Sequence, residues 1–319
     1  MKNRDQANYT DFRFDVRPLS PGGTPWQSDT IMGLMAWAVA LNEGESAIRE
    51  FLEPFLAGDP PFVVSDGFPS GLLPNPLIPL KTDHTYCTIQ ENSLAKKRKR
   101  ASLLTTKDFD SVRRGGVALG DPVASPWYQF QMLHASIDRI TWSTSGQGNL
   151  FSTVTQALPD KHRLLSVFVR AQHGWIDRVQ TIFGQLARIG FGKDKSIGCG
   201  SFEVESLVEE PHQFENFPRA DGFISISSWA PSSSDPTEGY WKLRMKRGKL
   251  GEGMGEGNPF KRPLVQFTAG STFKTDTTPE PFYGRTIKNL APGFSDAVQI
   301  CYCLAVPCVF PRTLPVKDV

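Results

Sequence analysis

Alternating apolar and polar residues near the N-terminus predict a strand, and helical spacing follows it. In DFRFDVRPLS, which begins at residue 11, Phe12, Phe14 and Val16 fall on one face. The segment GGTPWQSDTIMGLMAWAVAL then changes to helical spacing, and Ser28 is suited to cap the first turn with its hydroxyl. A second helix is expected over ESAIREFLEPFLAG, and the apolar PFVVSDGF predicts the next strand.

The same strand–helix–strand order recurs after a long insertion. RLLSVFVRA predicts a strand, HGWIDRVQTIFGQLARIG a helix, and SFEVESLVE a further strand. Two β-α-β units of this kind are typical of a split βαβ or ferredoxin-like sheet. Within the insertion, HASIDRITWSTSGQGNLFSTVTQAL predicts a hairpin with Gly146 and Gly148 at its tip.

The pattern of predicted elements changes near residue 211, where a second, β-rich unit is expected to begin. Helix signals are scarce after this point. The predicted strands are GFISISSWAPS, YWKLRMKRGKLG, PLVQFTAGSTFKT and AVQICYCLAVPCVF. The last of these carries Cys301, Cys303 and Cys308 without neighbouring histidines, which favours buried thiols over a zinc site.

A glycine-rich loop, Ile189 to Val204, lies where the predicted helix HGWIDRVQTIFGQLARIG gives way to the strand SFEVESLVE. It is the first candidate binding site. Its glycines would let backbone amides approach a phosphate, and Lys193 and Lys195 add positive charge. The loop fits neither a P-loop nor a dinucleotide fingerprint, because it follows a helix and precedes a strand. A glycine-rich turn with solvated lysines is the alternative interpretation.

The balance of basic and acidic residues restricts how this chain could bind nucleic acid. The 319 residues include 35 basic and 33 acidic side chains, so a nucleic-acid surface would depend on local clusters. The run KKRKR at residues 96–100 fits a phosphate-contacting arm or a solvated charged face. A second cluster around Lys246 and Arg262 lies beside aromatic residues that fit either a core or single-stranded RNA recognition.

Five scattered cysteines do not form a disulfide pattern, so reduced thiols in the cytoplasm are expected. The sequence predicts neither a signal peptide nor a membrane span.

Several separated motifs, taken in order, resemble the Csm-four family of type III-A CRISPR effector complexes, which belongs to the RAMP superfamily. They are GTPWQSDTIMGLMAWA, PPFVVSDGFPSGLLPNPL, KKRKRASLL, HASIDRITWST, GFGKDKSIGCGSFEV, YWKLRMKRGKLG and PFYGRTIKNLAPGF. The resemblance implies an α+β fold of two ferredoxin-like, RRM-like modules, residues 1–210 and 211–319. The first module would carry a β-hairpin thumb, at about residues 80–160, and the glycine-rich loop.

The resemblance also implies a non-catalytic subunit that holds the repeat-derived 5′ tag of the CRISPR RNA (crRNA) in antiviral defence. The implied partners are the large palm-domain signalling subunit and a backbone RAMP subunit, with no cofactor, metal or membrane. Residues of the basic, glycine-rich and aromatic motifs are expected to contact RNA. They are Ser28, Lys96, Lys97, Arg98, His134, Arg139, Gly192, Lys193, Lys195, Ser196, Gly198, Gly200, Lys246, Arg247, Arg262, Tyr283 and Arg285.

Alternatives stay open for some of these residues. Ser28 fits helix capping as well as phosphate binding, and Arg139 fits a surface ion pair with Asp138. Cys199 stands where a basic or bulky polar residue is expected between the glycines. The alternative function is a metal-independent RAMP endoribonuclease that processes CRISPR repeat RNA through histidine, although no histidine here lies in a catalytic motif.

Overall fold

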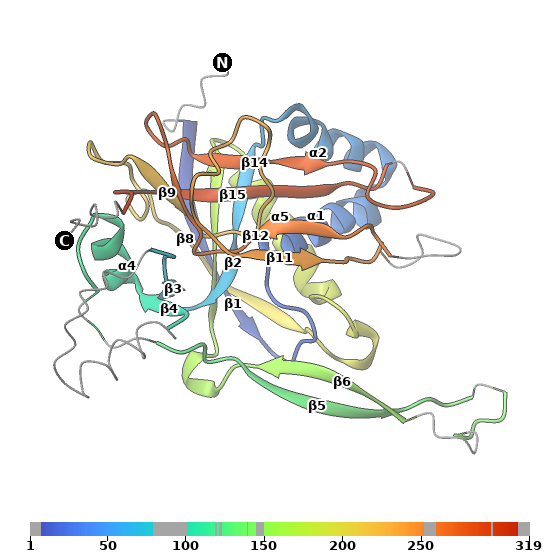
Figure 1. Ribbon diagram of the computed structural model, residues 1–319. Helices are drawn as coiled ribbons and strands as arrows, with labels where there is room; N and C mark the ends of the chain where they lie inside the picture. The colour runs from blue at the N-terminus through green and yellow to red at the C-terminus, as the bar shows by residue number, and fades with distance from the viewer. Residues whose placement is uncertain are drawn as a thin grey trace, which may run out of the picture.

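Antiparallel sheets dominate the fold, and few helices accompany them. The computed structural model describes residues 8–78, 101–118, 120, 123–138, 140–144, 150–251, 260–294 and 296–311. The longer helices are α1 (Ser28–Glu43), α2 (Glu45–Ala57) and α5 (Ile176–Ile189). Figure 1 shows them on one side of the sheets, as blue and yellow-green coils.

The first sheet contains the strands that the sequence predicts in the N-terminal half. They are β1 (Tyr9–Pro18), β2 (Phe62–Pro69), β7 (Leu165–Gln172) and β8 (Phe202–Glu209), in the order β2-β7-β1-β8. All neighbouring strands are antiparallel. Phe14 and Val16 are fully buried, which confirms the predicted apolar face of β1.

The predicted capping role of Ser28 is wrong. The N-cap of α1 is Gln27, whose side chain makes no capping hydrogen bond, and Ser28 is the first helical residue. The backbone N–H of Ser28 donates instead to Asp66 Oδ1 at 2.8 Å. The carboxyl group of Asp66, at the register shift within β2, therefore satisfies the helix amide, and the Ser28 hydroxyl can make another contact.

The insertion between β2 and β7 forms two short strands, a helix and a long hairpin. The elements are β3 (Leu72–Pro74), β4 (Leu103–Thr105), α4 (Thr106–Arg113), β5 (Tyr128–Ala135), β6 (Leu150–Ala157) and the short η2 (Asp160–His162). Figure 1 shows β5 and β6 extending away from the sheets along the bottom of the view. A hairpin is present as predicted, but β5 ends at Ala135, so its first strand lies almost wholly before the predicted segment, which begins at His134. The two tip glycines lie outside the described residues.

The C-terminal half forms a five-stranded sheet and a separate strand pair. The sheet is ordered β10-β13-β9-β15-β14. Its strands are β9 (Gly222–Ser225), β10 (Gly239–Tyr240), β13 (Thr272–Lys274), β14 (Phe282–Ile287) and β15 (Gln299–Cys308). The pair consists of β11 (Leu243–Lys246) and β12 (Leu264–Phe267). Among the described residues from 211 to 311 no helix occurs, so they give no support to a second ferredoxin-like module.

One hydrophobic core runs through both halves, since residues of β1, α1 and α5 share a cluster with Ile224, Ile300 and Leu304. A buried arginine also links the two halves through polar contacts. Arg170 on β7 pairs with Asp11 at 2.7 Å and donates to the carbonyl oxygens of Pro281 and Ala305 in the other half. The two halves are therefore held in a fixed relation by packing and by hydrogen bonds.

The prediction of buried strand thiols is confirmed for β15. Cys301 and Cys303 have no exposed surface, and Cys308 is 1% exposed. Burial raises the pKa of all three thiols, which keeps them protonated. The described helices include none long and apolar enough to cross a membrane.

Candidate nucleic-acid interface

The glycine-rich loop is anchored at its base on the segment between β1 and α1. Phe191 stacks on Trp26 with ring centroids 4.0 Å apart and an interplanar angle of 6°. The N–H of Gly200 donates to the carbonyl of Pro21 at 2.9 Å, and the N–H of Phe191 donates to the carbonyl of Gly200 at 2.7 Å. These contacts close the loop and leave its middle part facing outward.

Close packing against Thr24 explains why residue 192 of the loop is a glycine. A Cβ at Gly192 would lie 2.5 Å from the Cβ of Thr24, so a larger residue would push the two segments apart. The next residue uses the same partner, since the N–H of Lys193 donates to Thr24 Oγ1 at 3.1 Å. Thr24 is thus a site residue that sequence reasoning missed, although it lies in the quoted motif GTPW.

The exposed tip of the loop consists of Lys193, Ser196, Ile197 and Gly198, with a short 3-10 turn, η3 (Lys195–Ile197). Gly198 was predicted to offer its amide to phosphate, but this amide donates to the carbonyl of Lys195, as that of Gly200 does to Pro21. In the described part of the chain, the amides of Lys195 and Ser196 have no backbone acceptor. The amide of Gly192, which was also predicted, likewise has no backbone acceptor among the described residues, so the loop presents one of the three predicted glycine amides together with those of Lys195 and Ser196.

Trp37 on α1 holds one of the two loop lysines. The Nζ atom of Lys195 lies 4.4 Å from the centroid of the Trp37 ring, in cation–π contact. Gly251, from the segment after β11, packs on the edge of the same ring, because a Cβ there would lie 2.7 Å from Trp37 Cδ1. Lys193 is less constrained, with a side chain 48% exposed and its Nζ 3.8 Å from Asp194 Oδ2.

The β5–β6 hairpin begins beside the glycine-rich loop. Gly22 exchanges two backbone hydrogen bonds of 2.9 Å with Gln156 at the base of β6. Further out, His134 on β5 stacks on Phe151 at 5.1 Å, and its Nε2 lies 2.9 Å from Thr153 Oγ1. His134 is thus on the hairpin and outside the glycine-rich loop.

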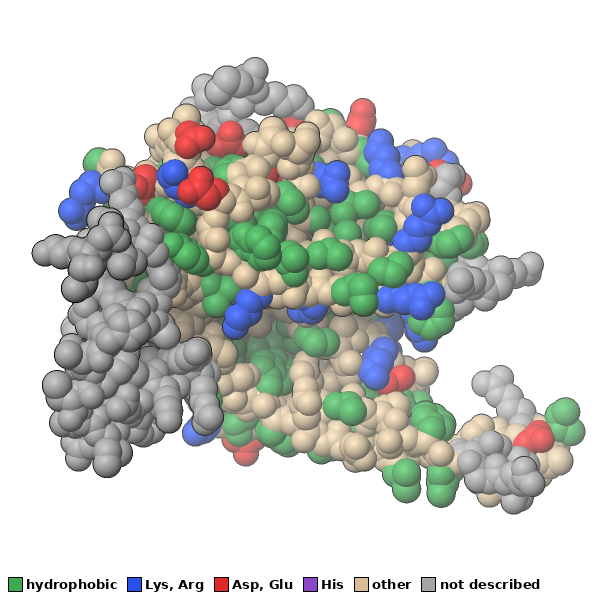
Figure 2. Space-filling view, viewed as in Figure 1, with side chains coloured by type: hydrophobic (Ala, Val, Ile, Leu, Met, Phe, Trp, Pro, Cys, Tyr) green, Lys and Arg blue, Asp and Glu red, His purple; other side chains and the backbone are tan. Residues whose placement is uncertain are grey.

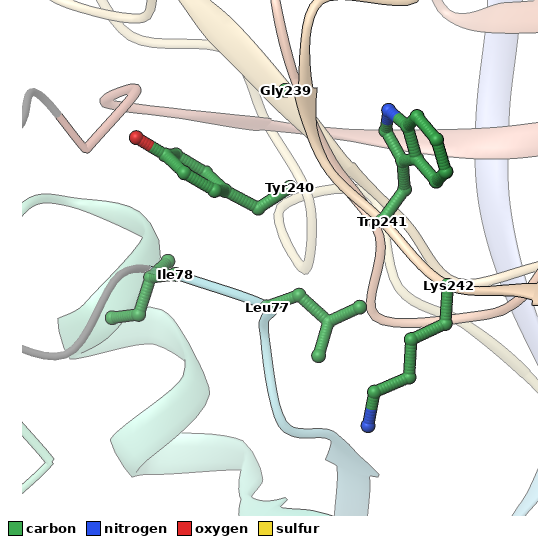
Figure 3. A pocket seen from close by; sticks show the side chains of 6 residues that line it. All are labelled: Leu77, Ile78, Gly239, Tyr240, Trp241 and Lys242. Carbon is green, nitrogen blue, oxygen red and sulfur yellow. The ribbon is translucent and has the colours of Figure 1, made fainter.

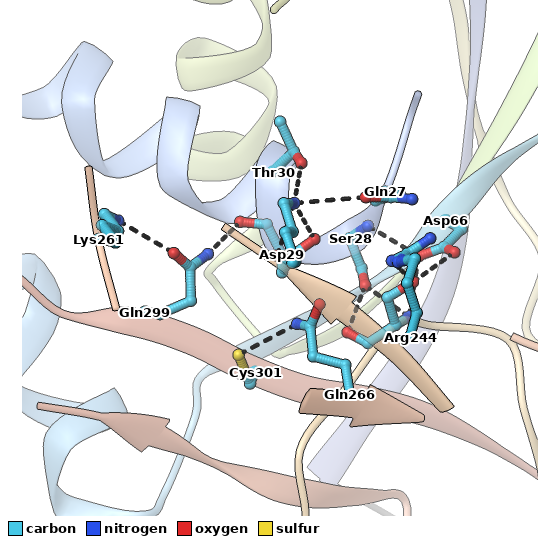
Figure 4. Close-up of polar contacts among 12 residues, drawn as sticks. Gln27, Ser28, Asp29, Thr30, Asp66, Arg244, Lys261, Gln266, Gln299 and Cys301 are labelled. Carbon is cyan, nitrogen blue, oxygen red and sulfur yellow. Dashed lines mark hydrogen bonds and ion pairs between the residues drawn. The ribbon is translucent and has the colours of Figure 1, made fainter. Parts of the chain in front are cut away.

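Lys246 does not face an open surface. Its Nζ contacts both carboxylate oxygens of Asp29, at 2.7 and 2.8 Å, and the side chain of Asp29 has no exposed surface. Gln27 and Thr30 supply further oxygens to the same ammonium group. Figure 4 labels the three residues that contact this group, Gln27, Asp29 and Thr30, at the start of α1. The prediction that Lys246 contacts RNA does not fit this position, because its charge is already neutralised.

Ser28 belongs to an adjoining network between the two halves of the chain (Figure 4). Its hydroxyl donates to the carbonyl of Ser228 at 3.0 Å, and the N–H of Ser228 donates back at 2.9 Å. Asp66 accepts from the N–H and the hydroxyl of Ser228, and Arg244 Nη2 donates to the same hydroxyl oxygen. Desolvation by burial raises the pKa of Asp66. Ser28 is 1% exposed, so the predicted phosphate contact is not supported by its position.

Tyr283 is likewise a core residue. It is 4% exposed, its ring stacks on Phe223 at 4.2 Å, and its hydroxyl accepts from the N–H of Glu280. Base stacking on this ring would require the core to open, so its predicted RNA contact does not fit the structure.

The other predicted cations are spread over the surface. Arg247 is exposed over the ring of Phe260 at 5.2 Å, and Arg262 is exposed before β12. Arg285 lies exposed on β14, at the edge of the five-stranded sheet. Lys96, Lys97, Arg98 and Arg139 lie outside the described residues.

Neither a protein-family model nor a curated protein sequence matches this chain. Solved structures do match it over nearly its whole length. Structures of the Csm1-Csm4 cassette in complex with AMPPNP and with cA4 give TM-scores of 0.60 and 0.63, at 18% and 16% sequence identity. The Csm3-Csm4 subcomplex in the type III-A CRISPR-Cas interference complex gives 0.56 at 13% identity. Each match covers 95% of this chain and 100% of the other.

The chain has the fold of a Csm-complex subunit. Csm4 is the component common to the three matched assemblies. The resemblance inferred from the motifs is therefore confirmed at the level of the fold. Because the identities lie below 20%, the roles of individual residues in this chain rest on their own geometry.

Proposed function

We propose that this protein is a non-catalytic RNA-binding subunit of a type III-A CRISPR interference complex, which holds the 5′ repeat-derived tag of the crRNA. The observation that carries the proposal is the likeness over 95% of the chain to structures of Csm1-Csm4 and Csm3-Csm4 assemblies. In this proposal the large signalling subunit and a backbone RAMP subunit are its partners, and the complex acts in antiviral defence within the cytoplasm.

We also propose that the N-terminal half is a ferredoxin-like module with the β5–β6 hairpin as its thumb. The strand order β2-β7-β1-β8, with α1 and α5 as the connections, supports this assignment. The proposed RNA path passes the tip of the glycine-rich loop, where Lys193, Lys195 and the amides of Lys195 and Ser196 would meet phosphates.

Replacing Lys193 and Lys195 with alanine is expected to weaken binding of tag RNA. Each charge-assisted contact to phosphate contributes about 1.5 kcal/mol, so the double variant should bind at least tenfold more weakly. For single-stranded RNA each lost contact should also reduce the slope of log K against log salt by about 0.7. A filter-binding titration over salt concentration measures both quantities.

The matched control replaces two exposed lysines elsewhere, Lys107 on α4 and Lys288 after β14, with alanine. This variant has the same net charge as the test variant, so a general electrostatic effect would weaken both alike. If the control and the test variant bind with the same affinity and the same salt slope, the glycine-rich loop is not the RNA contact.

Reconstitution tests the role in the complex directly. A complex assembled without this subunit should lose protection of the crRNA 5′ tag from an added nuclease and should release the large subunit. Full protection of the tag in its absence would contradict the proposal.

The absence of catalysis is also a proposal, and the histidines give its test. Proton transfer in metal-free RNA cleavage would need a histidine near the scissile phosphate. His134 is bonded to a threonine hydroxyl, and His212 pairs with Glu215 at 85% side-chain exposure. We expect repeat RNA to stay intact with the pure protein, and alanine at His134 or His173 to leave target cleavage by the whole complex unchanged. Specific cleavage of repeat RNA by the pure protein, abolished by either substitution, would establish the endoribonuclease instead.

A further inference from the structure

The strand pair β11–β12 exposes an aliphatic face. The side chains of β11 alternate, because Arg244 and Lys246 point into the network with Ser228 and Asp29. Leu243 and Met245 therefore point the other way and are 53% and 72% exposed, and Val265, opposite Met245 on β12, is 52% exposed. Figure 2 shows hydrophobic side chains gathered on the front of the molecule, where β11 and β12 lie in Figure 1. Solvent-exposed aliphatic groups on adjacent strands are typical of an interaction surface.

The outer edge of β11 is open. Both backbone groups of Phe267 bond to Trp229, on the side of β12 that faces away from β11. Leu243, which is opposite Phe267, is therefore in a non-hydrogen-bonded pair, and so is Met245, two residues further along. The N–H and C=O groups of Leu243 and Met245 thus point away from β12, and no described strand pairs with them. Such an edge can accept a further strand.

The rim of this face is basic. The described residues 239–251 and 260–267 contain no aspartate or glutamate. Of their cations, Lys242, Arg247, Lys249 and Arg262 are exposed. A partner segment with acidic residues at its ends would therefore complement this surface.

The aromatic residues nearby favour a protein partner over RNA. Trp241 is fixed by a hydrogen bond from Nε1 to the carbonyl of Thr237 and by contact of its ring with Phe267. The ring of Phe260 is occupied by Arg247 and Lys249, each within 5.2 Å of its centroid. Bases stack on aromatic faces, whereas the groups exposed in the centre of this face, Leu243, Met245 and Val265, are aliphatic.

A pocket continues the surface at the start of β11. It has a volume of about 370 Å³ and is lined by Leu77, Ile78, Gly239, Tyr240, Trp241 and Lys242. Figure 3 shows the side chains of Leu77 and Ile78 opposite Tyr240 and Trp241, with Lys242 at the margin. The pocket can hold an apolar side chain of the partner, and the ammonium group of Lys242 can form an ion pair with a carboxylate beside that side chain.

We infer that β11 is a docking edge for an extended segment of a partner protein, in which apolar residues alternate and acidic residues flank them. The segment adds as a third strand beside β11, its apolar side chains cover Leu243, Met245 and Val265, and its flanking carboxylates meet the basic rim. Main-chain hydrogen bonds along the edge would supply affinity, and the side-chain alternation would supply specificity. The inference concerns a protein and stands whether or not the glycine-rich loop binds RNA.

The probe is a fluorescein-labelled peptide of eleven residues in which valine alternates with threonine between paired glutamates, and binding to the full chain is followed by anisotropy. Met245→Pro removes an N–H that points away from β12, so no hydrogen bond to β12 is lost. Edge strands tolerate proline at such positions. We expect binding at least tenfold weaker for Met245→Pro and for Met245→Glu. Leu133→Glu on the hairpin is the matched control, since Leu133 is also 72% exposed, and should bind as the parent does.

The second arm of the experiment separates strand addition from simple charge attraction. A peptide with proline at its two central valines has the same charge and cannot form a strand, so it should bind at least tenfold more weakly than the parent peptide. Equal binding of both peptides, unchanged binding by the Met245 variants, or no binding of the first peptide would overturn the inference. Competition by a twelve-nucleotide oligouridine that is lost in Met245→Glu would assign the face to RNA instead. Thermal unfolding of each variant confirms that the fold is retained, and Met245→Glu replaces Met245→Pro if the proline is not tolerated.

Discussion

Replacing Gly200 with alanine is expected to lower the free energy of unfolding by about 4 kcal/mol. Gly200 has a φ of +73°, where a side chain costs about 1–3 kcal/mol. An added Cβ would also lie 2.0 Å from the carbonyl oxygen of Phe191, so the backbone itself has to move. That movement breaks the hydrogen bond that anchors the loop on Pro21 and disturbs the stack of Phe191 on Trp26.

Gly198→Ala is the matched control in the same loop. Its φ is +86°, but a Cβ there would meet no atom within 4 Å. Only the conformational cost, about 1–3 kcal/mol, is expected, without the added cost of moving the backbone. Urea denaturation of the two variants gives the comparison, and similar losses in both would show that the contact with Phe191 relaxes freely. Binding of RNA by the folded Gly198→Ala variant then reports on the loop tip alone.

The elements with strong periodicity could be predicted from the sequence. The strands β1, β7 and β8 and the helices α1, α2 and α5 lie where apolar alternation or helical spacing placed them, because burial on one face forces that pattern. The short elements β3, β4 and α4 were not predicted. Their segment is dominated by charge and proline, and α4 depends on Thr105, whose hydroxyl caps it by accepting from Asp108.

The candidate site was predicted less well, for a physical reason. The motif identified the glycine-rich loop and its lysines, but motif residues can be buried or paired once the two halves pack together. Lys246 and Tyr283 are examples, since the first neutralises a carboxylate on α1 and the second fills the core. Trp37 could not be found in this way, because its contact with Lys195 joins residues more than 150 positions apart.

Replacing Lys246 with methionine is expected to destabilise the fold by about 3 kcal/mol. Its removal leaves the side chain of Asp29 without its ammonium partner, and Asp29 has no exposed surface. A buried carboxylate that loses its partner typically costs 3–5 kcal/mol, and the partial exposure of Lys246, 24%, favours the lower end. The same substitution at Lys288, which is exposed after β14, should change the free energy of unfolding by less than about 0.5 kcal/mol.

The double variant Lys246→Met, Asp29→Asn decides whether the lost ion pair is the cause. Asparagine removes the charge that Lys246 neutralises, so the double variant should regain at least about 1.5 kcal/mol relative to Lys246→Met alone. If the two losses simply add, the pair contributes nothing and Lys246 acts through packing. At a temperature where Lys246→Met remains folded, its salt slope for tag RNA should equal that of the parent protein, because the ammonium group already faces Asp29. A reduced slope would return Lys246 to the RNA surface and would mean that RNA displaces it from the carboxylate.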